Sequence, residues 1–220
     1  PDYETKNSYT ATVTASDGVN SATQDITVNV TNVNDNSPRF TSSATFSAAE
    51  NQTAIDTVTA TDADGDGIIY SISGSDITIN SSSGVIAFVS APDFEAKTSY
   101  TATVTASDGV NTITQDITVN VTNINDIAPV FTSANNFSVV EGQTAIGTIT
   151  ATDAEGDDVT FTVSGSELEV TSAGVLTFVS VPDYETKSSY SATVTASDGV
   201  NQTNQNLSLI HISEPTRPID

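Results

Sequence analysis

Short acidic motifs recur along the chain at a fixed spacing, and their residue types suit one kind of chemistry. An Asp-x-Glu motif occupies Asp2–Glu4, Asp93–Glu95 and Asp183–Glu185, so its copies lie 91 and then 90 residues apart. An Asn-Asp pair stands at Asn34–Asp35 and again at Asn125–Asp126. Carboxylate and amide oxygens are hard ligands, which Ca²⁺ binds in sets of about 6 to 8. These motifs therefore supply the ligand types of a divalent-cation site.

The same spacing relates longer segments, which makes the chain a tandem repeat. Thr61–Asp64 matches Thr152–Glu155, and each Asp-x-Glu motif is followed by a segment close to SYTATVTASDGVN. One unit is therefore about 90 residues long. This period is too long for a solenoid turn and suits a domain with its own core.

The elements that must position these motifs are short β-strands. Tyr100–Ala106 and Ile117–Val121 alternate apolar with polar residues, the pattern of half-buried strands, and glycine-containing turns such as Ser107–Asn111 separate them. Strands of the complete unit are predicted at 40–42, 46–49, 54–60, 68–73, 77–80, 85–89, 99–107 and 111–121. With the first two taken as one split strand, about seven antiparallel strands predict an all-β fold of tandem immunoglobulin-like Greek-key β-sandwich repeats. A small β-barrel is the weaker alternative.

The repeat divides the chain into four predicted segments. Residues 1–34 are the C-terminal fragment of a first repeat, 35–125 a complete repeat, and 126–206 a repeat lacking most of its last strand. Residues 1–31 supply only two strands, so their core cannot form as in a whole repeat. Residues 207–220 are interpreted as a non-native tail, because 207–218 resemble the in-frame translation of an adapter used in DNA library preparation.

Composition excludes several classes of function. The chain has 28 acidic and 5 basic residues and a formal net charge of -23, which repels nucleic acids and anionic lipids and favours cations as partners. It has no Cys, and its one His, His211, lies in the tail, so we expect no enzyme. No apolar run approaches the ~20 residues that cross a bilayer, and no leader precedes Pro1, so a soluble internal fragment is expected.

Several motifs together resemble cadherin repeats across residues 1–206. Asn32–Phe40 and Asn123–Phe131 are similar to the inter-repeat linker of that family, D-x-N-D-N-x-P. Ala49–Asn51 resembles its early glutamate motif, Ala106–Asp108 its late aspartate motif, and the D-x-E and D-x-D motifs are also present. The absence of Cys, the Thr/Asn/Ser-rich strands and the short 62–67 loop are more similar to bacterial cadherin-like surface adhesins than to animal junctional cadherins.

The resemblance implies a calcium site at each junction between repeats. At the second junction it implies the ligands Glu50, Asp93, Glu95, Ile124, Asn125, Asp126, Ile127, Asp153, Glu155 and Asp198. At the first junction it implies Asp2, Glu4, Val33, Asn34, Asp35, Asn36, Asp62, Asp64 and Asp108. Ile124 and Ile127 would ligate through main-chain carbonyls. The first junction lacks an early glutamate in this chain, so we expect fewer ions or weaker binding there.

Some positions depart from the family pattern. Asn32 and Asn123 stand where the family has an acid, and Glu155 replaces the second Asp of D-x-D, which leaves two or three ions open at the second junction. Half-sites for junctions outside the chain are implied at Asp17, Glu141, Asp183 and Glu185. Solvated loop acids are expected at Asp66, Asp157 and Asp158, and packing aromatics at Tyr3, Phe94 and Tyr184.

Together these features predict calcium-ion binding that rigidifies an extracellular, cell-surface adhesin or stalk. Extracellular calcium modules bind at about 10⁻⁴ to 10⁻³ M, so such sites fill outside cells. The predicted partners are calcium and, through parts outside this chain, cell-surface proteins or glycans, with neither nucleic acid nor membrane insertion. Homophilic adhesion stays open. The alternative is an accessory polysaccharide-binding module of a large secreted protein, which an aromatic strip would favour.

Overall fold

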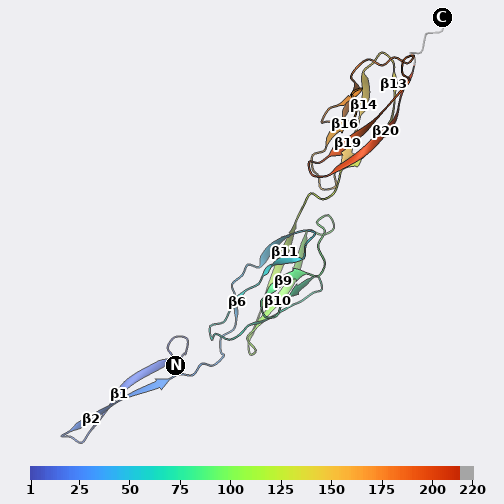
Figure 1. Cartoon of the computed structure of the whole chain (residues 1–220). Helices are drawn as coiled ribbons and strands as arrows, with labels where there is room; N and C mark the ends of the chain where they lie inside the picture. Colours follow the sequence, from blue (N-terminus) through green and yellow to red (C-terminus); the bar gives the residue numbers. More distant parts are fainter. Residues whose placement is uncertain (214–220) are drawn as a thin grey trace. The chain divides into compact units, whose positions relative to one another are not determined.

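A computed structural model describes residues 1–213, and side chains through residue 207. The described residues form β-strands and turns (Figure 1). The chain divides into two compact units, Pro1–Thr122 and Asn123–Asp220, and each is considered by itself. The described residues include no helix of the length and hydropathy that a membrane crossing requires.

The first unit begins with a β-hairpin and continues with a β-sandwich, here called the second repeat. The hairpin strands are β1 (Ser8–Ser16) and β2 (Ser21–Asn29). The sandwich strands are β3 (Arg39–Phe40), β4 (Thr45–Ala49), β5 (Ala54–Thr57), β6 (Ala60–Thr61), β7 (Ile69–Ile72), β8 (Ile77–Ile79), β9 (Val85–Phe88), β10 (Ser99–Ser107) and β11 (Thr112–Thr122). Each predicted strand is present within a few residues, and the all-β sandwich fold is confirmed.

Two layers of strands form the second repeat. One layer is a sheet in the order β4-β11-β10-β7, and the other contains the sheet β5-β9-β8 together with the pair β3-β6. The predicted split strand is observed, because β3 pairs with β6 while β4 pairs with β11 in the other layer. The β4–β11 pair is parallel, so the prediction of antiparallel strands throughout was wrong at this one strand. The chain passes from β3 in one layer to β4 in the other without reversing direction, so the split strand contributes to both sheets.

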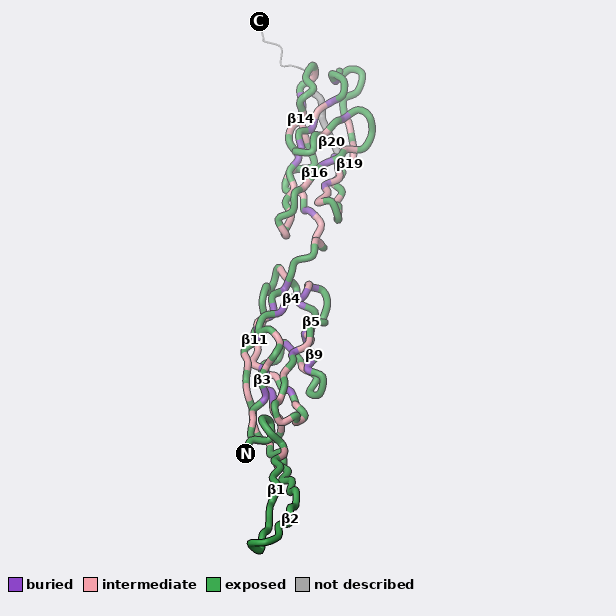
Figure 2. Tube along the Cα trace, turned by 90° about the vertical axis from the view of Figure 1, so that its left-hand side faces the viewer, coloured by how far each residue is buried: buried purple, intermediate pink, exposed green. Residues whose placement is uncertain are grey.

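The core lies between the two layers (Figure 2). Its fully covered members include Val104 of β10, Ile86 of β9 and Ile117 and Val119 of β11. Along β10 and β11 these side chains alternate with less buried residues, most of them polar, which is the pattern that the sequence predicts. The predicted strand at 54–60 is broken instead, because Val58 turns its side chain fully inward between β5 and β6.

The second unit, here called the third repeat, has the same topology. Its strands are β12 (Val130–Phe131), β13 (Asn136–Val140), β14 (Ala145–Thr148), β15 (Ala151–Thr152), β16 (Thr160–Val163), β17 (Leu168–Val170), β18 (Val175–Phe178), β19 (Ser189–Ser197) and β20 (Gln202–Ser213). The sheet β13-β20-β19-β16 packs over β14-β18-β17 and the pair β12-β15. The buried core repeats that of the second repeat, with Val194 in place of Val104 and Leu176 in place of Ile86.

The predicted non-native tail begins inside β20. Leu207 is fully buried at the core position that Ile117 has in the second repeat, and the β20 backbone pairs with β13 from Leu209 to Ser213. Side chains from residue 208 onward, and all of 214–220, lie outside the described part. The segment boundaries and the origin of the tail stay predictions.

The hairpin differs from its copies in burial but not in pairing. β1 and β2 pair from Ser8–Asn29 to Ser16–Ser21, in the register that β10 and β11 share. Val13 is 50% exposed, whereas Val104, its counterpart, is 0% exposed. The hairpin therefore presents an uncovered apolar face, as the sequence predicts for two strands without a partner layer (Figure 2).

Candidate metal sites

The linker of the second repeat, residues 32–38, wraps around the carboxylate of Asp64. The backbone N–H groups of Asp35 and Asn36 donate to Asp64 Oδ2 at 3.1 and 2.8 Å. The Asn36 side-chain amide donates to Asp64 Oδ1 at 2.9 Å and to Asp35 Oδ1 at 3.0 Å. Asn32 donates to the Asp64 carbonyl at 2.8 Å. Hydrogen bonds from the Asn36 side-chain amide and, to a lesser extent, from its backbone N–H hold the pKa of Asp64 below its usual value.

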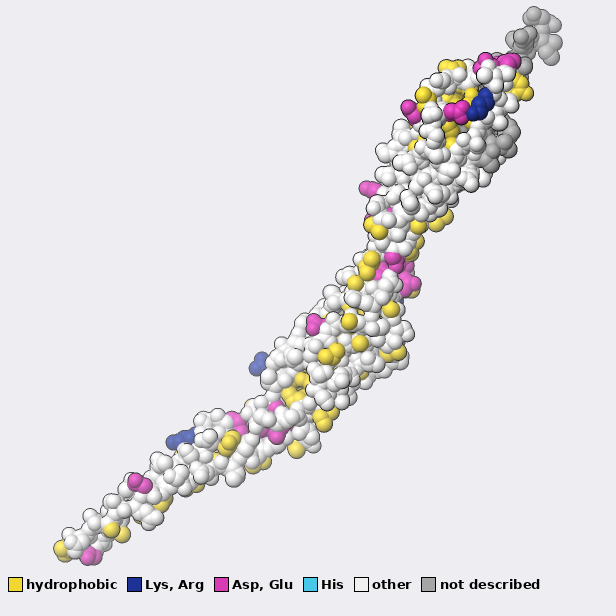
Figure 3. All heavy atoms as spheres, in the orientation of Figure 1, with side chains coloured by type: hydrophobic (Ala, Val, Ile, Leu, Met, Phe, Trp, Pro, Cys, Tyr) yellow, Lys and Arg dark blue, Asp and Glu magenta, His cyan; other side chains and the backbone are white. Residues whose placement is uncertain are grey.

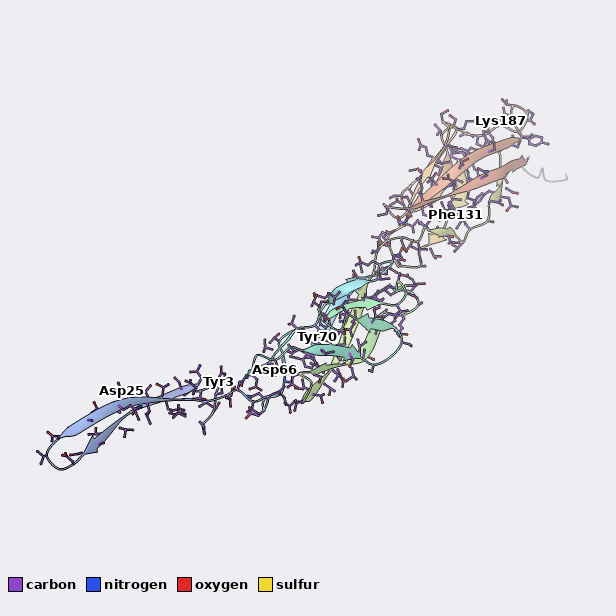
Figure 4. The ribbon with its side chains drawn as sticks, turned by 60° about the horizontal axis from the view of Figure 1, so that its bottom comes forward. Tyr3, Asp25, Asp66, Tyr70, Phe131 and Lys187 are labelled. Carbon is purple, nitrogen blue, oxygen red and sulfur yellow. The ribbon has the colours of Figure 1, made fainter. Side chains whose placement is uncertain are left out.

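Asp62 organises the loop that follows β6. Its Oδ1 accepts from the N–H of Asp64 at 2.9 Å and of Asp66 at 3.4 Å, which closes the loop on itself. Its Oδ2 is buried and has no hydrogen-bond partner among the described residues. Carboxylate oxygens of Asp62, Asp64 and Asp66 lie within 4.8 Å of one another, and Figure 4 shows Asp66 at the hairpin end of the second repeat. Asp66, predicted to be merely solvated, therefore stands close enough to join a site.

The turn after β10 brings Asp108 to the same linker. Asp108 Oδ1 accepts from the N–H of Val110 and Asn111 at 2.7 and 2.6 Å, around Gly109, whose φ of 95° suits glycine. Burial alone raises the pKa of Asp108, but these N–H donors outweigh it and leave the pKa lowered. The Asn111 amide donates to Asn34 Oδ1 at 2.8 Å and to the Asn36 carbonyl at 3.0 Å.

The hairpin contributes one carboxylate to this cluster. Glu4 lies with Asp35 and Asp64 so that one oxygen of each is within 4.8 Å of the others. The N–H of Glu4 lowers the pKa of its own carboxyl, but loss of hydration and the neighbouring carboxyls of Asp2 and Asp64 outweigh it and raise the pKa. Asp2 is engaged locally, because its carboxylate accepts from the hydroxyl of Thr5 at 2.8 Å and from the N–H of Glu4 at 3.1 Å.

A second cluster of acids lies within the first unit beside the end of β4. Oxygens of Glu50, Asp93 and Glu95 approach within 4.8 Å of one another. Glu50 is 2% exposed, and its Oε2 accepts from the N–H of Phe94 at 2.8 Å. Asn51, at φ 61°, turns the chain directly after Glu50, and its N–H donates to the Pro92 carbonyl. These two hydrogen bonds hold the predicted early glutamate motif against the predicted D-x-E motif.

The third repeat builds its linker site from equivalent residues. The N–H groups of Asp126 and Ile127 donate to Glu155 Oε2 at 3.0 and 2.8 Å, and Glu155 N–H donates to Asp153 Oδ1 at 2.9 Å. Asp198 Oδ1 accepts from the N–H of Val200 and Asn201, both within 2.7 Å. Three carboxylate oxygens of this site are buried without a hydrogen-bond partner in the described part: Asp153 Oδ2, Glu155 Oε1 and Asp198 Oδ2.

The predicted half-site of the third repeat is also assembled. Oxygens of Glu141, Asp183 and Glu185 lie within 4.8 Å of one another, and Glu141 Oε2 accepts from the N–H of Tyr184 at 3.1 Å. The Tyr184 side chain is 40% exposed and Tyr3 37%, whereas Phe94 packs against the core. The packing role predicted for these aromatics therefore holds most fully for Phe94.

Sequence reasoning overlooked the asparagines that link these acids. Asn111 and its counterpart Asn201 each hold a linker Asn, with Asn201 donating to Asn125 Oδ1 at 2.6 Å. The signal was available, since both asparagines end the recurring segment SDGVN. Val33 and Ile124 have exposed side chains, as is expected of positions implied to act only through main-chain carbonyls.

The donor types of these clusters suit a hard divalent cation. The donors are carboxylate and amide oxygens, and several carboxylate oxygens are buried without a donor, which costs free energy unless a cation meets them. The two salt bridges of the described residues, Lys97–Asp76 and Lys187–Glu167, lie outside these clusters. Figure 3 shows many Asp and Glu but few Lys and Arg side chains on the visible face. The residues present therefore fit Ca²⁺.

Comparisons with known proteins show which proteins share this architecture. Human protocadherin Fat 4 is 34% identical over 213 residues, which cover 84% of this chain and 4% of that protein. The crystal structure of mouse cadherin-23 EC22-24 superposes with a TM-score of 0.68 at 27% identity, covering 98% of this chain and 77% of that one. The repeats of this chain are therefore similar to the extracellular repeats of cadherins. Protocadherin gamma B2 extracellular cadherin domains 3-6 have the same fold, with a TM-score of 0.78 at 23% identity over 97% of this chain and 62% of that one.

A family model described as "Bacterial Ig domain" also matches residues 125–210. The cadherin-like repeats thus carry the immunoglobulin-like sandwich that the sequence predicts. The matched domains of protocadherin gamma B2 are extracellular cadherin domains of that protein. The chain spans about 4% of the length of protocadherin Fat 4, so these similarities concern the repeats and not a whole protein.

Proposed function

We propose that this chain is a calcium-binding segment of an extracellular adhesion stalk, in which ions couple consecutive cadherin-like repeats. The observation that carries the proposal is the meeting of Glu4 from the hairpin with Asp35 and Asp64 of the second repeat within 4.8 Å. Glu4 belongs to the first repeat of the sequence, and Asp35 and Asp64 belong to the second. Without a cation they repel one another. Against the effect of its own N–H, the pKa of Glu4 is raised by loss of hydration, by the carboxyl of Asp2 and by that of Asp64.

In this proposal the side chains hold the ion and the linker transmits its effect. Glu4, Asp35, Asp62 and Asp64 provide carboxylate oxygens, and Asn34 adds an amide oxygen. Bound Ca²⁺ supplies the positive charge that removes the repulsion between them. The ion then cross-links acids that otherwise repel one another, and the hairpin can no longer pivot about the linker. The third repeat holds the same ion type through Asn125, Asp126, Asp153, Glu155 and Asp198.

The source and the partner are finer parts of the proposal. We infer a bacterial surface adhesin, because the bacterial immunoglobulin-domain model matches the third repeat and the chain contains no Cys. The inference that the chain has no enzymatic role rests on the cadherin relatives and on the lack of His outside the tail. Polysaccharide binding is not favoured, because few of the described aromatic side chains are exposed. The aromatics with large exposure in the described part are Tyr3, Tyr9 and Tyr184. Of these, Tyr9 stands at a core position of its own repeat.

A calcium titration of the full chain tests the proposal. We expect isothermal titration calorimetry to show binding with Kd of about 10⁻⁴ to 10⁻³ M. Small-angle scattering recorded in parallel should show a narrower distribution of interatomic distances at saturation. The variant Asp35→Asn/Asp126→Asn should lose most of both effects, because each linker loses one carboxylate.

The matched control removes the same charge elsewhere. In the variant Asp56→Asn/Asp116→Asn two acids that belong to none of the clusters described above are neutralised, and we expect wild-type binding. Equal weakening in both variants would mean that calcium is only a diffuse counterion. Absence of binding at millimolar Ca²⁺ would leave a calcium-independent sandwich stalk.

A further inference from the structure

The two linker sites differ at one pair of facing positions. In the second repeat, Asn36 faces Asp64, and donors meet both carboxylate oxygens of Asp64: two backbone N–H groups at Oδ2 and the Asn36 amide at Oδ1. In the third repeat, Ile127 faces Glu155. The same two N–H groups meet Glu155 Oε2, but the isoleucine side chain offers no donor, and Glu155 Oε1 is buried without a hydrogen-bond partner.

A second difference follows along the same linker. In the second repeat the Asn111 amide donates to Asp108 Oδ2 at 3.2 Å. In the third repeat Asn201 gives its amide to the side chain and the carbonyl of Asn125, at 2.6 and 3.3 Å, and Asp198 Oδ2 is left without a partner. Among the carboxylates of the two linker sites in the described part, three buried oxygens therefore lack a hydrogen-bond partner in the third repeat, against Asp62 Oδ2 alone in the second.

This difference changes what an arriving cation must displace. A buried carboxylate oxygen without a donor is destabilising, and a cation that meets it recovers that cost. An amide N–H pointing at the same oxygen carries partial positive charge, so it opposes the cation and must rotate away. Asn36 imposes that penalty on Asp64, whereas Ile127 imposes none on Glu155.

We infer that the Ile127–Glu155 pair makes the linker site of the third repeat fill with calcium before that of the second, where the Asn36–Asp64 pair keeps the acid satisfied without an ion. The inference rests on the proposed function. It assigns Asn36 and Ile127 opposite roles in setting affinity, although neither side chain is a ligand. The two linkers of one chain then order at different calcium concentrations.

Nuclear magnetic resonance titration of the full chain with Ca²⁺ gives each linker its own midpoint. The amide resonances of Asp35 and Asp126 are the probes, because each N–H donates to the acid concerned. In the wild-type chain we expect the Asp126 midpoint to be lower, by on the order of tenfold. The first repeat contributes only a hairpin beside the linker site of the second repeat, and we expect this difference in ligands to lower the affinity there as well. Exchange of the Asn36–Asp64 and Ile127–Glu155 pairs is therefore the decisive comparison.

Two exchange variants separate these causes. Asn36→Ile/Asp64→Glu should lower the Asp35 midpoint, and Ile127→Asn/Glu155→Asp should raise the Asp126 midpoint, with the other linker unchanged in each. Ile127→Asn alone should raise the Asp126 midpoint in part, and Ile127→Val, which adds no donor, should leave it unchanged. Amide dispersion in chelator checks that every variant is folded.

The outcomes distinguish the inference from the proposed function. Titration of both linkers with midpoints that the exchanges leave unmoved, or move the other way, would overturn the inference and leave calcium binding standing. The reverse direction would mean that Asn36 preorganises the acids for the ion. If neither amide responds to millimolar Ca²⁺, the proposed function itself fails.

Discussion

At the residue scale, backbone N–H groups rather than basic side chains hold the acids of this chain. Asp62, Asp108 and Asp198 each point one oxygen at the N–H groups of their own loop. The second oxygen has no hydrogen-bond partner among the described residues in Asp62 and Asp198, and in Asp108 it accepts from the Asn111 side-chain amide. Such local hydrogen bonds are typical of Asp at turns. They fix the direction of the second oxygen without using it, so the same turn chemistry that folds the loop also prepares a ligand.

The few lysines serve a different purpose, which predicts a local pH response. Lys97 Nζ lies 2.9 Å from Asp76 Oδ2 and 3.9 Å from the ring centre of Tyr100, and Lys187 repeats this arrangement with Glu167 and Tyr190. The hydrogen bond and charge of Lys97 lower the pKa of Asp76 below its usual value of 3.8. A lowered pKa in the folded state contributes stability above pH 3.8, and that contribution is lost as the pH falls through the folded value.

We therefore expect the Asp76 carboxyl carbon, followed by nuclear magnetic resonance, to titrate below 3.8 in the wild-type chain. In Lys97→Met its pKa should return toward that value. Both Lys97 and Asp76 are about half exposed, so the effect on stability is small. An Asp76 pKa that does not respond to Lys97→Met would show that the ion pair does not persist in solution.

The sequence could predict the ligand types but not the polar network around them. The acids recur at a fixed spacing, so their grouping followed from the repeat and the resemblance. The donation from Asn36 to Asp64, and its absence at Ile127, depends on which way one amide points, and no sequence pattern encodes that direction. Asp66 was missed for a similar reason, because its distance from Asp62 depends on how tightly the loop closes.

At the element scale, the sandwich depends on a few places where backbones touch. Gly84, at φ 72°, precedes β9, and its carbonyl accepts from the N–H of Val58 at 2.9 Å. A Cβ on Gly84 would collide with the Val58 carbonyl, and Gly174 has the same relation to Ile149 in the third repeat. This contact holds the break between β5 and β6, where Val58 enters the core. The alternation of residues 54–60 conceals that break, which is why the sequence predicted one strand.

Substitution of Gly84 should be among the most damaging single changes in the second repeat. For Gly84→Ala we expect a loss of about 4 kcal/mol in the free energy of unfolding, because a backbone collision adds to positive-φ strain of about 1–3 kcal/mol. Gly74→Ala is the matched control, since Gly74 has φ 95° but nothing within 4 Å of a Cβ, and only the strain is expected. Urea unfolding followed by circular dichroism measures both, and equal losses would mean that the Val58 carbonyl moves aside.

At the scale of the whole molecule, charge opposes folding throughout. A net charge of -23 on 220 residues makes the folded chain repel itself, and the opposition is strongest at low ionic strength. The composition alone predicts this property, whereas the arrangement of the two units does not follow from either composition or motif.

We expect the thermal midpoint in chelator to rise as NaCl is added, because the Debye length falls from about 30 Å at 0.01 M to about 10 Å at 0.1 M salt. Calcium should produce a further rise at concentrations too low to change that length. Differential scanning calorimetry in NaCl, in MgCl₂ and in CaCl₂ at matched ionic strength separates screening from site binding. Equal midpoints in the two divalent salts would argue for screening alone.

The hairpin described above has a consequence for how such chains reach their native state. Tyr9–Asn20 and Tyr100–Asn111 have the same sequence, yet the first is uncovered and the second is packed in a core. During synthesis the first copy leaves the ribosome earlier, when the sandwich that needs the second copy is still open. Because their side chains are identical, either copy fits the same strand position in that sandwich equally well. Duplication of the repeat thus also sets neighbouring copies in competition for the same partner strands, and the order in which they emerge becomes part of what decides the fold.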